Sequence, residues 1–239
     1  MVQYDTIGKL FERSKTTAAF SAADTYSLLH EVGQVTGPAL DLACGYGHNT
    51  RLLYERGAAP VRGVDISEEM IRLAREAEQR LGQGIEYMVA DVATMPVLGA
   101  HQLATAVYLF NYAPTREALR SMFRAIRANL APDGRLVAIV PNPCPFPESN
   151  WDLFHVTVRE RLPTAEAPLL KAAFLIDKPV AFEFYEWQRE DLEHAASEGG
   201  FGTVAWRPVI TPPADDRFTE ELWTAYRRTP VSSMMICHR

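Results

Sequence analysis

The residues best suited to chemistry lie in segment 40–47, which reads LDLACGYG and ends a short apolar run. Gly45 and Gly47 would let the backbone approach a ligand closely, because glycine tolerates conformations that other residues avoid. A helix that begins just after this turn would also offer its unpaired N–H groups. Asp65 follows Gly45 by 20 residues and ends a second apolar run. At that place a carboxylate can accept hydrogen bonds from the two hydroxyls of a ribose.

A glycine turn followed by an acid would also fit a dinucleotide, but further residues favour a cationic nucleoside. Thr50 stands where the third glycine of a dinucleotide fingerprint is expected. Asp91 ends a third apolar run, where it can accept from the exocyclic amine of an adenine. Asp41 would repel a pyrophosphate placed at the turn. Acids at successive strand ends therefore favour a positively charged, adenosine-bearing ligand.

The elements that must position these residues alternate between apolar runs and amphipathic segments. A short apolar run bounded by turn residues predicts a buried parallel strand, and a 3.6-residue repeat predicts a helix. Ser67 is expected to cap the second helix, and Thr115 begins the third. The predicted strands cover 39–43, 61–65, 85–90, 103–109 and 135–140, and the predicted helices cover 48–56, 68–81 and 115–130. This order predicts an α/β fold: a Rossmann-like, mostly parallel sheet with helices on both faces.

The chain is expected to form one domain, 1–239, in which other parts are added to a cofactor-binding core at 37–141. Residues 1–36 are polar and helix-prone and are predicted to form an N-terminal cap of two helices. Prolines recur between 141 and 147 and cannot continue a central strand, so 142–188 is interpreted as a lid insertion after the fifth strand. Within it, Val180–Tyr185 alternates enough to be a strand. The C-terminal part, 189–239, is predicted to contain a helix at 189–199 and strands at 203–208 and 232–237.

The composition is that of a globular protein: 47% of the 239 residues are hydrophobic, 23% are charged, and the formal net charge is −6. No basic face is visible, so nucleic acid is not an expected partner. The 3 cysteines are widely spaced and form neither a metal motif nor a disulfide framework. No leader pattern and no apolar run of about 20 residues is visible, so no membrane association is expected. We expect a cytoplasmic monomer or homodimer that acts on a small molecule and holds no metal.

Successive motifs of this sequence resemble those of class I S-adenosylmethionine-dependent methyltransferases. The likeness spans about 39–140 and rests on 41–47, Val64-Asp65, Ala90-Asp91-Val92 and 130–134. The resemblance implies a sheet of seven strands whose last strand is antiparallel. It implies S-adenosyl-L-methionine as cofactor and S-adenosyl-L-homocysteine as product, with Gly45 and Gly47 near the methionine part. By the same likeness Asp65 holds the ribose, and Asp91 and Val92 hold the adenine.

A narrower likeness extends beyond this core. The segments Tyr4-Asp5-Thr6-Ile7-Gly8, Lys15, 106–113 and Pro141-Asn142-Pro143 are similar to a bacterial group that includes the toxoflavin-forming azapteridine N-methyltransferases. The likeness is weaker in the insertion, where substrate contacts would lie, and the group includes members that act on other substrates. The resemblance would fold the N-terminal helix over the cofactor and bring the Tyr4 phenol toward the transferred methyl group.

The same resemblance assigns the remaining cofactor contacts. Lys15 could reach the carboxylate of the cofactor, although a solvated position is the usual one for a helix lysine. Asp41 is expected to be structural or to face the cofactor rather than to act in catalysis. The full predicted cofactor set is Tyr4, Lys15, Asp41, Ala43, Cys44, Gly45, Gly47, Asp65, Ile66, Met70, Asp91, Val92 and Tyr108.

Methyl transfer from a sulfonium has a neutral leaving group and needs no metal, so positioning supplies much of the rate. Asn111 lies just past the fourth strand, where it can form hydrogen bonds but cannot take a proton at neutral pH. The other catalytic candidates are Tyr4, which could instead anchor the cap, and His155, which could simply be exposed. The predicted substrate contacts are Tyr4, Asn111, Tyr112, Asn142, Trp151, His155 and Tyr185.

These residues favour N-methylation of a heterocyclic secondary metabolite by proximity, but other interpretations stay open. Aromatic residues of the insertion, Trp151, Phe154, Tyr185 and Trp187, either line a flat pocket or form the core of the lid. O- or C-methylation of a hydroxylated aromatic or an isoprenoid phosphate is the first alternative, although the lid's basic residues are scattered. A non-catalytic S-adenosylmethionine-binding regulator and a nicotinamide dehydrogenase are alternatives of other classes.

Overall fold

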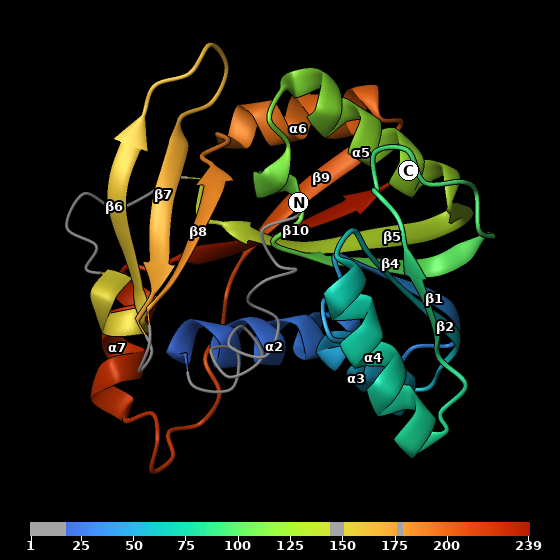
Figure 1. Ribbon diagram of the computed structural model, residues 1–239, viewed down its shortest axis with the longest axis horizontal. Helices are drawn as coiled ribbons and strands as arrows, with labels where there is room; N and C mark the ends of the chain where they lie inside the picture. The colour runs from blue at the N-terminus through green and yellow to red at the C-terminus, as the bar shows by residue number, and fades with distance from the viewer. Residues whose placement is uncertain (1–17, 144–150, 176–178) are drawn as a thin grey trace.

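A seven-stranded sheet forms the centre of the computed structural model, which describes residues 18–143, 151–175 and 179–239 (Figure 1). The strands lie in the order β3-β2-β1-β4-β5-β10-β9. β1 pairs in parallel with β2 and β4, whereas β10 is antiparallel to β5 and β9. The strands are β1 (Gly37–Leu42), β2 (Ala58–Asp65), β3 (Glu86–Val89), β4 (His101–Val107), β5 (Leu130–Pro141), β9 (Thr203–Pro208) and β10 (Ser232–His238). The predicted Rossmann-like sheet with an antiparallel last strand is confirmed.

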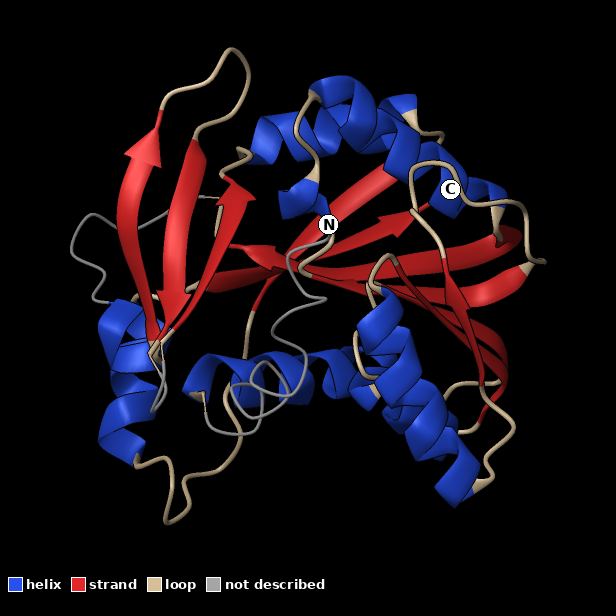
Figure 2. Ribbon diagram, viewed as in Figure 1, coloured by secondary structure: helices blue, strands red, loops and turns tan. Residues whose placement is uncertain are grey.

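Helices cover both faces of this sheet (Figure 2). One face carries α2 (Ala19–Val32), α3 (His48–Glu55) and α4 (Glu68–Leu81), and the other carries α5 (Arg116–Ala128) and α6 (Arg189–Glu198). Successive side chains of a strand point to opposite faces. In β5, Leu136 and Ala138 therefore join the apolar cluster beneath α5, while Val137 and Ile139 join the cluster beneath α2 and α3. β5 therefore contributes side chains to the apolar clusters on both faces of the sheet.

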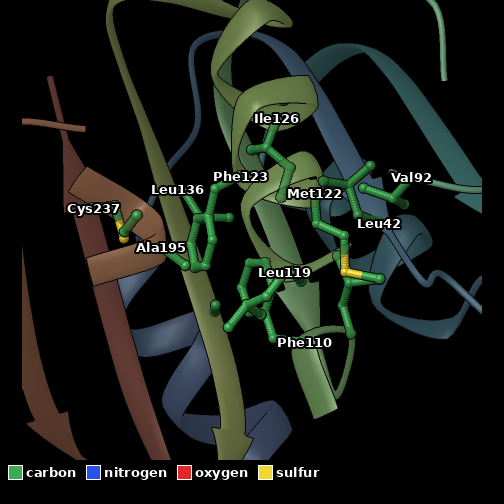
Figure 3. Close-up of a cluster of buried hydrophobic side chains, with 14 of the residues drawn as sticks. Leu42, Val92, Phe110, Leu119, Met122, Phe123, Ile126, Leu136, Ala195 and Cys237 are labelled. Carbon is green, nitrogen blue, oxygen red and sulfur yellow. The ribbon is translucent and has the colours of Figure 1, made fainter. Parts of the chain in front are cut away.

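The α5 layer shows why a periodic sequence becomes a packed helix. Its buried residues repeat at helical spacing and meet Leu136 of β5 and Ala195 of α6 (Figure 3). Thr115 caps the helix by accepting a hydrogen bond from the Ala118 N–H at 3.1 Å. The predicted cap of α4 is confirmed in the same way, because Ser67 accepts from the Met70 N–H at 3.3 Å.

The insertion after β5 forms a second, smaller sheet with the antiparallel order β6-β7-β8. Its strands are β6 (Val156–Leu162), β7 (Leu169–Phe174) and β8 (Val180–Tyr185). Of the two short 3-10 helices, η3 (Trp151–Phe154) directly precedes β6, whereas η2 (Phe110–Tyr112) follows β4 of the main sheet. Val180, Phe182 and Phe184 alternate inward along β8. They share an apolar cluster with α7 (Glu220–Arg228), whose Trp223 and Tyr226 are fully buried.

Several predicted bounds are corrected by the structure. In the insertion, β8 was expected, but β6 and β7 were not. In the C-terminal part, α7 was not expected. The fourth strand ends at Val107 rather than at Leu109, because Tyr108 adopts a φ of 57° that ends the extended conformation. Leu130 begins β5 opposite His101 instead of ending the preceding helix. Of the two helices expected in 1–36, the described residues include α2.

Candidate active site

One pocket lies at the carboxyl ends of the central parallel strands, where ligands of open α/β sheets bind. The turn after β1 contributes Ala43, Cys44 and Gly45, and the end of β2 contributes Asp65. The opposite wall comes from α2, from the segment that follows β4 and from the β6-β7-β8 sheet. The pocket therefore joins the predicted cofactor turn to the insertion that was expected to carry substrate contacts.

The glycine turn has a left-handed backbone on the wall of this pocket. Ala43, Gly45 and Gly47 have φ values of 53°, 56° and 82°. A Cβ added at Gly45 would meet nothing within 4 Å, so the turn is open on the pocket side. At Gly47 a Cβ would collide with the hydroxyl of Tyr87, which packs against the turn. Glycine is thus required at 47 for room as well as for φ.

Asp65 ties the turn to β2. Its Oδ2 accepts from the Gly45 N–H at 2.8 Å, and its Oδ1 accepts from the Ser67 N–H at 2.9 Å. Only 8% of the residue is exposed, yet it lines the pocket. A carboxylate oxygen has room for more than one donor. Asp65 therefore fixes the turn and presents its carboxylate on the pocket wall.

Asp41 has a different role from Asp65, although both belong to the predicted cofactor set. Asp41 is 1% exposed and accepts from the hydroxyls of Thr50 and Thr105, each at 2.7 Å. Burial raises the pKa of Asp41 to about 6, although both hydroxyls oppose this shift. Its carboxylate links β1 to α3 and β4 and does not line the pocket. Thr50, noted in the sequence as a missing glycine, is a partner of this buried acid.

The other predicted cofactor residues divide into two groups. Cys44, Met70 and Tyr108 line the pocket, and burial raises the pKa of the Cys44 thiol, with the charge of Asp65 adding to the effect. The second group, Ile66, Asp91 and Val92, lies outside the pocket wall that the described residues form. Ile66 is 47% exposed, and Val92 packs in the core. Asp91 is exposed and accepts a hydrogen bond from the Ala93 N–H. Tyr4 and Lys15 lie outside the described residues.

The insertion and α2 place an aromatic chamber beside the glycine turn, formed by Phe20, Trp151, Phe174, Phe182 and Phe184. Phe174 stacks on Phe182 with ring centroids 4.2 Å apart, and Phe20 stacks on Phe174 at 6.1 Å. Phe20 also meets the edge of Tyr108 at 6.1 Å. Parallel aromatic rings form a wall suited to a flat, apolar ligand.

Asn111 is the predicted catalytic residue that the structure places on the pocket wall. It is 5% exposed, and within the described ranges its Oδ1 is buried without a hydrogen-bond partner. A buried acceptor of this kind is unfavourable unless a ligand or water satisfies it. Tyr112 and Trp151, both predicted substrate contacts, also line the pocket.

The remaining predicted substrate contacts serve other interactions. Asn142 donates to the Pro230 carbonyl at 3.0 Å and accepts from Ser233, so it braces the end of β10. His155 has a φ of 68° in the turn before β6 and is not part of the described wall. Tyr185 packs against the main core, as does Trp187, whose indole donates to the Ala113 carbonyl at 3.0 Å.

Sequence reasoning missed Asp24, a buried acid on the pocket wall. It is 2% exposed and accepts from the Tyr108 hydroxyl and the Ser232 hydroxyl, each at 2.6 Å. The pKa of Tyr108 is well above its usual value because the phenol is buried, and the negative charge of Asp24 adds to this effect. The spacing Phe20, Asp24, Leu28 puts an acid on the buried stripe of α2, which was the available signal.

Comparisons with known proteins agree with this fold and with the family resemblance. Residues 39–134 match a methyltransferase domain family. The chain is 30% identical over 191 residues to a trans-aconitate 2-methyltransferase of an Azoarcus species, covering 74% of the chain and 71% of that protein. It is 26% identical over 184 residues to the Streptomyces griseus N-demethylindolmycin N-methyltransferase, covering 74% and 75%. The match to a Thermus thermophilus demethylmenaquinone methyltransferase is 35% over 109 residues, 44% of the chain and about half (48%) of that relative.

Solved structures show the same fold at low identity. An S-adenosylmethionine-dependent methyltransferase from Clostridium acetobutylicum aligns with a TM-score of 0.63 at 18% identity, covering 98% of this chain and 96% of its own. The Burkholderia thailandensis 1,6-didemethyltoxoflavin-N1-methyltransferase aligns with a TM-score of 0.61 at 16% identity, covering 100% and 84%. The family is shown by the methyltransferase domain match at 39–134 and by the Azoarcus relative, of which the chain covers 71% at 30% identity. This chain belongs to the S-adenosylmethionine-dependent methyltransferases.

The residues at the turn fit the cofactor of this family. The open side of Gly45 leaves space against the backbone, and the Asp65 carboxylate supplies acceptors beside that space. Within the described ranges there is no group of three or more side chains suited to hold a metal ion. No helix in the same ranges is long and apolar enough to cross a membrane.

Proposed function

We propose that this protein methylates a nitrogen of a small, planar heterocycle by holding the acceptor in line with S-adenosyl-L-methionine. The single observation that carries the proposal is the shared pocket. Its wall combines the open glycine turn with the aromatic chamber and the buried Asn111 Oδ1. When bound, the cofactor supplies an electrophilic methyl group on a cationic sulfur. The protein's own contribution is then to bind, orient and exclude water.

The cofactor half of the proposal assigns roles to the turn and the acids. Gly45 and Gly47 bring the backbone close to the methionine part, and Asp65 accepts from the ribose hydroxyls. Asp91, Val92 and Ile66 are proposed for the adenine side, where β2 and β3 end. Tyr4 and Lys15 keep the roles that the resemblance gives them, near the methyl group and the cofactor carboxylate.

The acceptor half rests on the chamber. Stacked rings favour a flat ligand, and the Asn111 amide oxygen can orient the substrate by accepting a hydrogen bond from its N–H. Because Asn111 takes no proton, the methylated nitrogen would release its proton to water. The Streptomyces griseus relative and the Burkholderia thailandensis neighbour are both named N-methyltransferases. A cytoplasmic location, a role in secondary metabolism and a monomeric or homodimeric state belong to the same proposal.

O-methylation of a carboxylate is the alternative that the Azoarcus relative suggests, since that protein is named for trans-aconitate. An acceptor with several carboxylates would be expected to meet lysine or arginine side chains. The described residues on the pocket wall include Asp24 and Asp65 but neither lysine nor arginine. This composition favours a neutral or cationic heterocycle over a polyanion.

Two measurements test the proposal. Calorimetric titration should give strong binding of S-adenosyl-L-homocysteine and none of NADH, and the reverse result would reject the methyltransferase assignment. An acceptor panel containing azapteridines, indoles, trans-aconitate and a quinol should then release S-adenosyl-L-homocysteine fastest with a nitrogen heterocycle. Faster release with trans-aconitate or the quinol would replace N-methylation by the O- or C-methyl alternative. Cofactor binding with no turnover of any acceptor would favour the regulatory alternative.

A further inference from the structure

The strongest unassigned feature is the buried carboxylate of Asp24, which lines the pocket from α2. Its side chain bridges two parts of the main sheet, because Tyr108 follows β4 and Ser232 begins β10. The Ser232 hydroxyl also lies 3.0 Å from the hydroxyl of the fully buried Tyr226. The hydroxyls of Tyr108 and Ser232 therefore hold this acid, and the Tyr226 hydroxyl is linked to it through Ser232.

Asp24 lies at the edge of the aromatic chamber. Phe20 is one helical turn before it on α2, and the ring of Tyr108 connects the two residues. A flat ligand that stacks against Phe20 and Phe174 would therefore have its edge near the Asp24 carboxylate. Hydroxyl donors stabilise the charged form of a carboxylate. Burial raises the pKa values of Tyr108 and Tyr226, and the negative charge of Asp24 adds to both shifts.

We propose that Asp24 is a specificity-determining residue that binds an N–H donor or a cationic nitrogen of the acceptor and rejects anionic acceptors. This inference rests on the proposed function and narrows its substrate class to planar nitrogen bases that carry a proton, such as amidine-like or amino-substituted heterocycles. An acceptor carboxylate or phosphate would meet the Asp24 carboxylate in a mostly apolar pocket, which disfavours binding.

A plainer role is that Asp24 only fastens α2 to β10 and to the end of β4. The two roles are separable, because fastening depends on hydrogen bonds and selection depends on charge. Asp24→Asn keeps the shape of the side chain and removes the charge. Ser232→Ala is the matched control, because it removes one of the same hydrogen bonds and keeps the charge.

The test uses three probes that share one ring and differ in charge: benzamidine, benzamide and benzoate. Each is titrated calorimetrically into the full-length protein saturated with S-adenosyl-L-homocysteine. The wild type and Ser232→Ala should bind benzamidine more tightly than benzoate. Asp24→Asn should lose about 10- to 100-fold in the benzamidine-to-benzoate preference, the effect of a hydrogen bond to a charged group, with benzamide binding changed less than threefold. Thermal unfolding of each variant checks that it is folded.

The outcomes separate the two proposals. If S-adenosyl-L-homocysteine binds but the benzamidine preference is absent in the wild type or unchanged in Asp24→Asn, the role of Asp24 is wrong and the methyltransferase proposal stands. Equal loss of the preference in Ser232→Ala would likewise overturn charge selection in favour of fastening. If S-adenosyl-L-homocysteine does not bind the wild type, the proposed function fails, and this inference fails with it.

Discussion

Asp65 allows the most quantitative prediction, because it binds two backbone N–H groups of the protein and is also proposed to bind the ribose of the cofactor. Asp65→Ala removes the acceptors of the Gly45 and Ser67 N–H groups and the proposed acceptor of the ribose. A hydrogen bond to a charged group contributes about 1.5–3 kcal/mol, and a loosened turn adds about 1 kcal/mol. S-adenosyl-L-homocysteine should therefore bind the variant roughly 70- to 1000-fold more weakly.

The ribose contribution can be isolated with a ligand change. The 2′-deoxyribose analogue of S-adenosyl-L-homocysteine lacks one hydroxyl that Asp65 is proposed to bind. Calorimetric titration of both ligands into the wild type and Asp65→Ala closes a thermodynamic cycle. We expect a coupling free energy of at least about 1 kcal/mol, since the variant has already lost the partner of that hydroxyl.

Asp91→Ala supplies the control for this cycle. Asp91 is assigned to the adenine, so its loss should weaken both ligands by the same factor. A coupling near zero at Asp65 would refute the ribose assignment and leave Asp65 as an anchor of the glycine turn. Coupling at Asp91 equal to that at Asp65 would show that the analogue binds in a different position.

Three further predictions concern the turn, the buried acid and the acceptor wall. Asn111→Ala should lower turnover by about tenfold or more while S-adenosyl-L-homocysteine affinity changes little, since only the acceptor-side hydrogen bond is lost; equal loss in both would contradict this. Gly47→Ala should reduce the free energy of unfolding in urea by about 1–3 kcal/mol, and by more than Gly82→Ala, which has positive φ but open space around its Cβ position. Because the pKa of Asp41 is about 6 in the native protein against 3.8, the native state holds this proton more tightly than the unfolded state. Wild-type stability relative to Asp41→Asn should therefore fall by about 2 kcal/mol as pH rises from 4 to 7, and a pH-independent difference would contradict the shift.

The sequence predicted the parts of the fold that depend on local patterns. The apolar run before the glycine turn, the Ser67 cap and the α5 stripe each need only neighbouring residues to be recognised. The resemblance to a family then supplied the antiparallel last strand. The small sheet was recognised only at β8, because β6 contains three consecutive charged residues and β7 lacks the regular alternation of β8. Pairing between such strands is set by tertiary contacts.

The site was predicted less completely, for a related reason. Asp41 and Asp65 both sit on apolar strands, and the hydroxyls of Thr50 and Thr105, 9 and 64 residues away in the chain, show that Asp41 faces inward. Phe182 and Phe184 line the pocket while Tyr185 packs against the main core, because successive residues of β8 point to opposite faces. Asp24 contacts Ser232, 208 residues later in the chain, and no local pattern predicts a contact over that separation.

The central claim is that the glycine turn and Asp65 hold the adenosyl part of a sulfonium donor beside the aromatic chamber. A crystal structure of the protein with S-adenosyl-L-homocysteine tests it most directly. We predict the ribose hydroxyls within hydrogen-bond distance of the Asp65 carboxylate and the sulfur directed toward Asn111 and the chamber. An adenosyl group bound elsewhere, with Asp65 bonded only to the Gly45 and Ser67 N–H groups, would contradict the account.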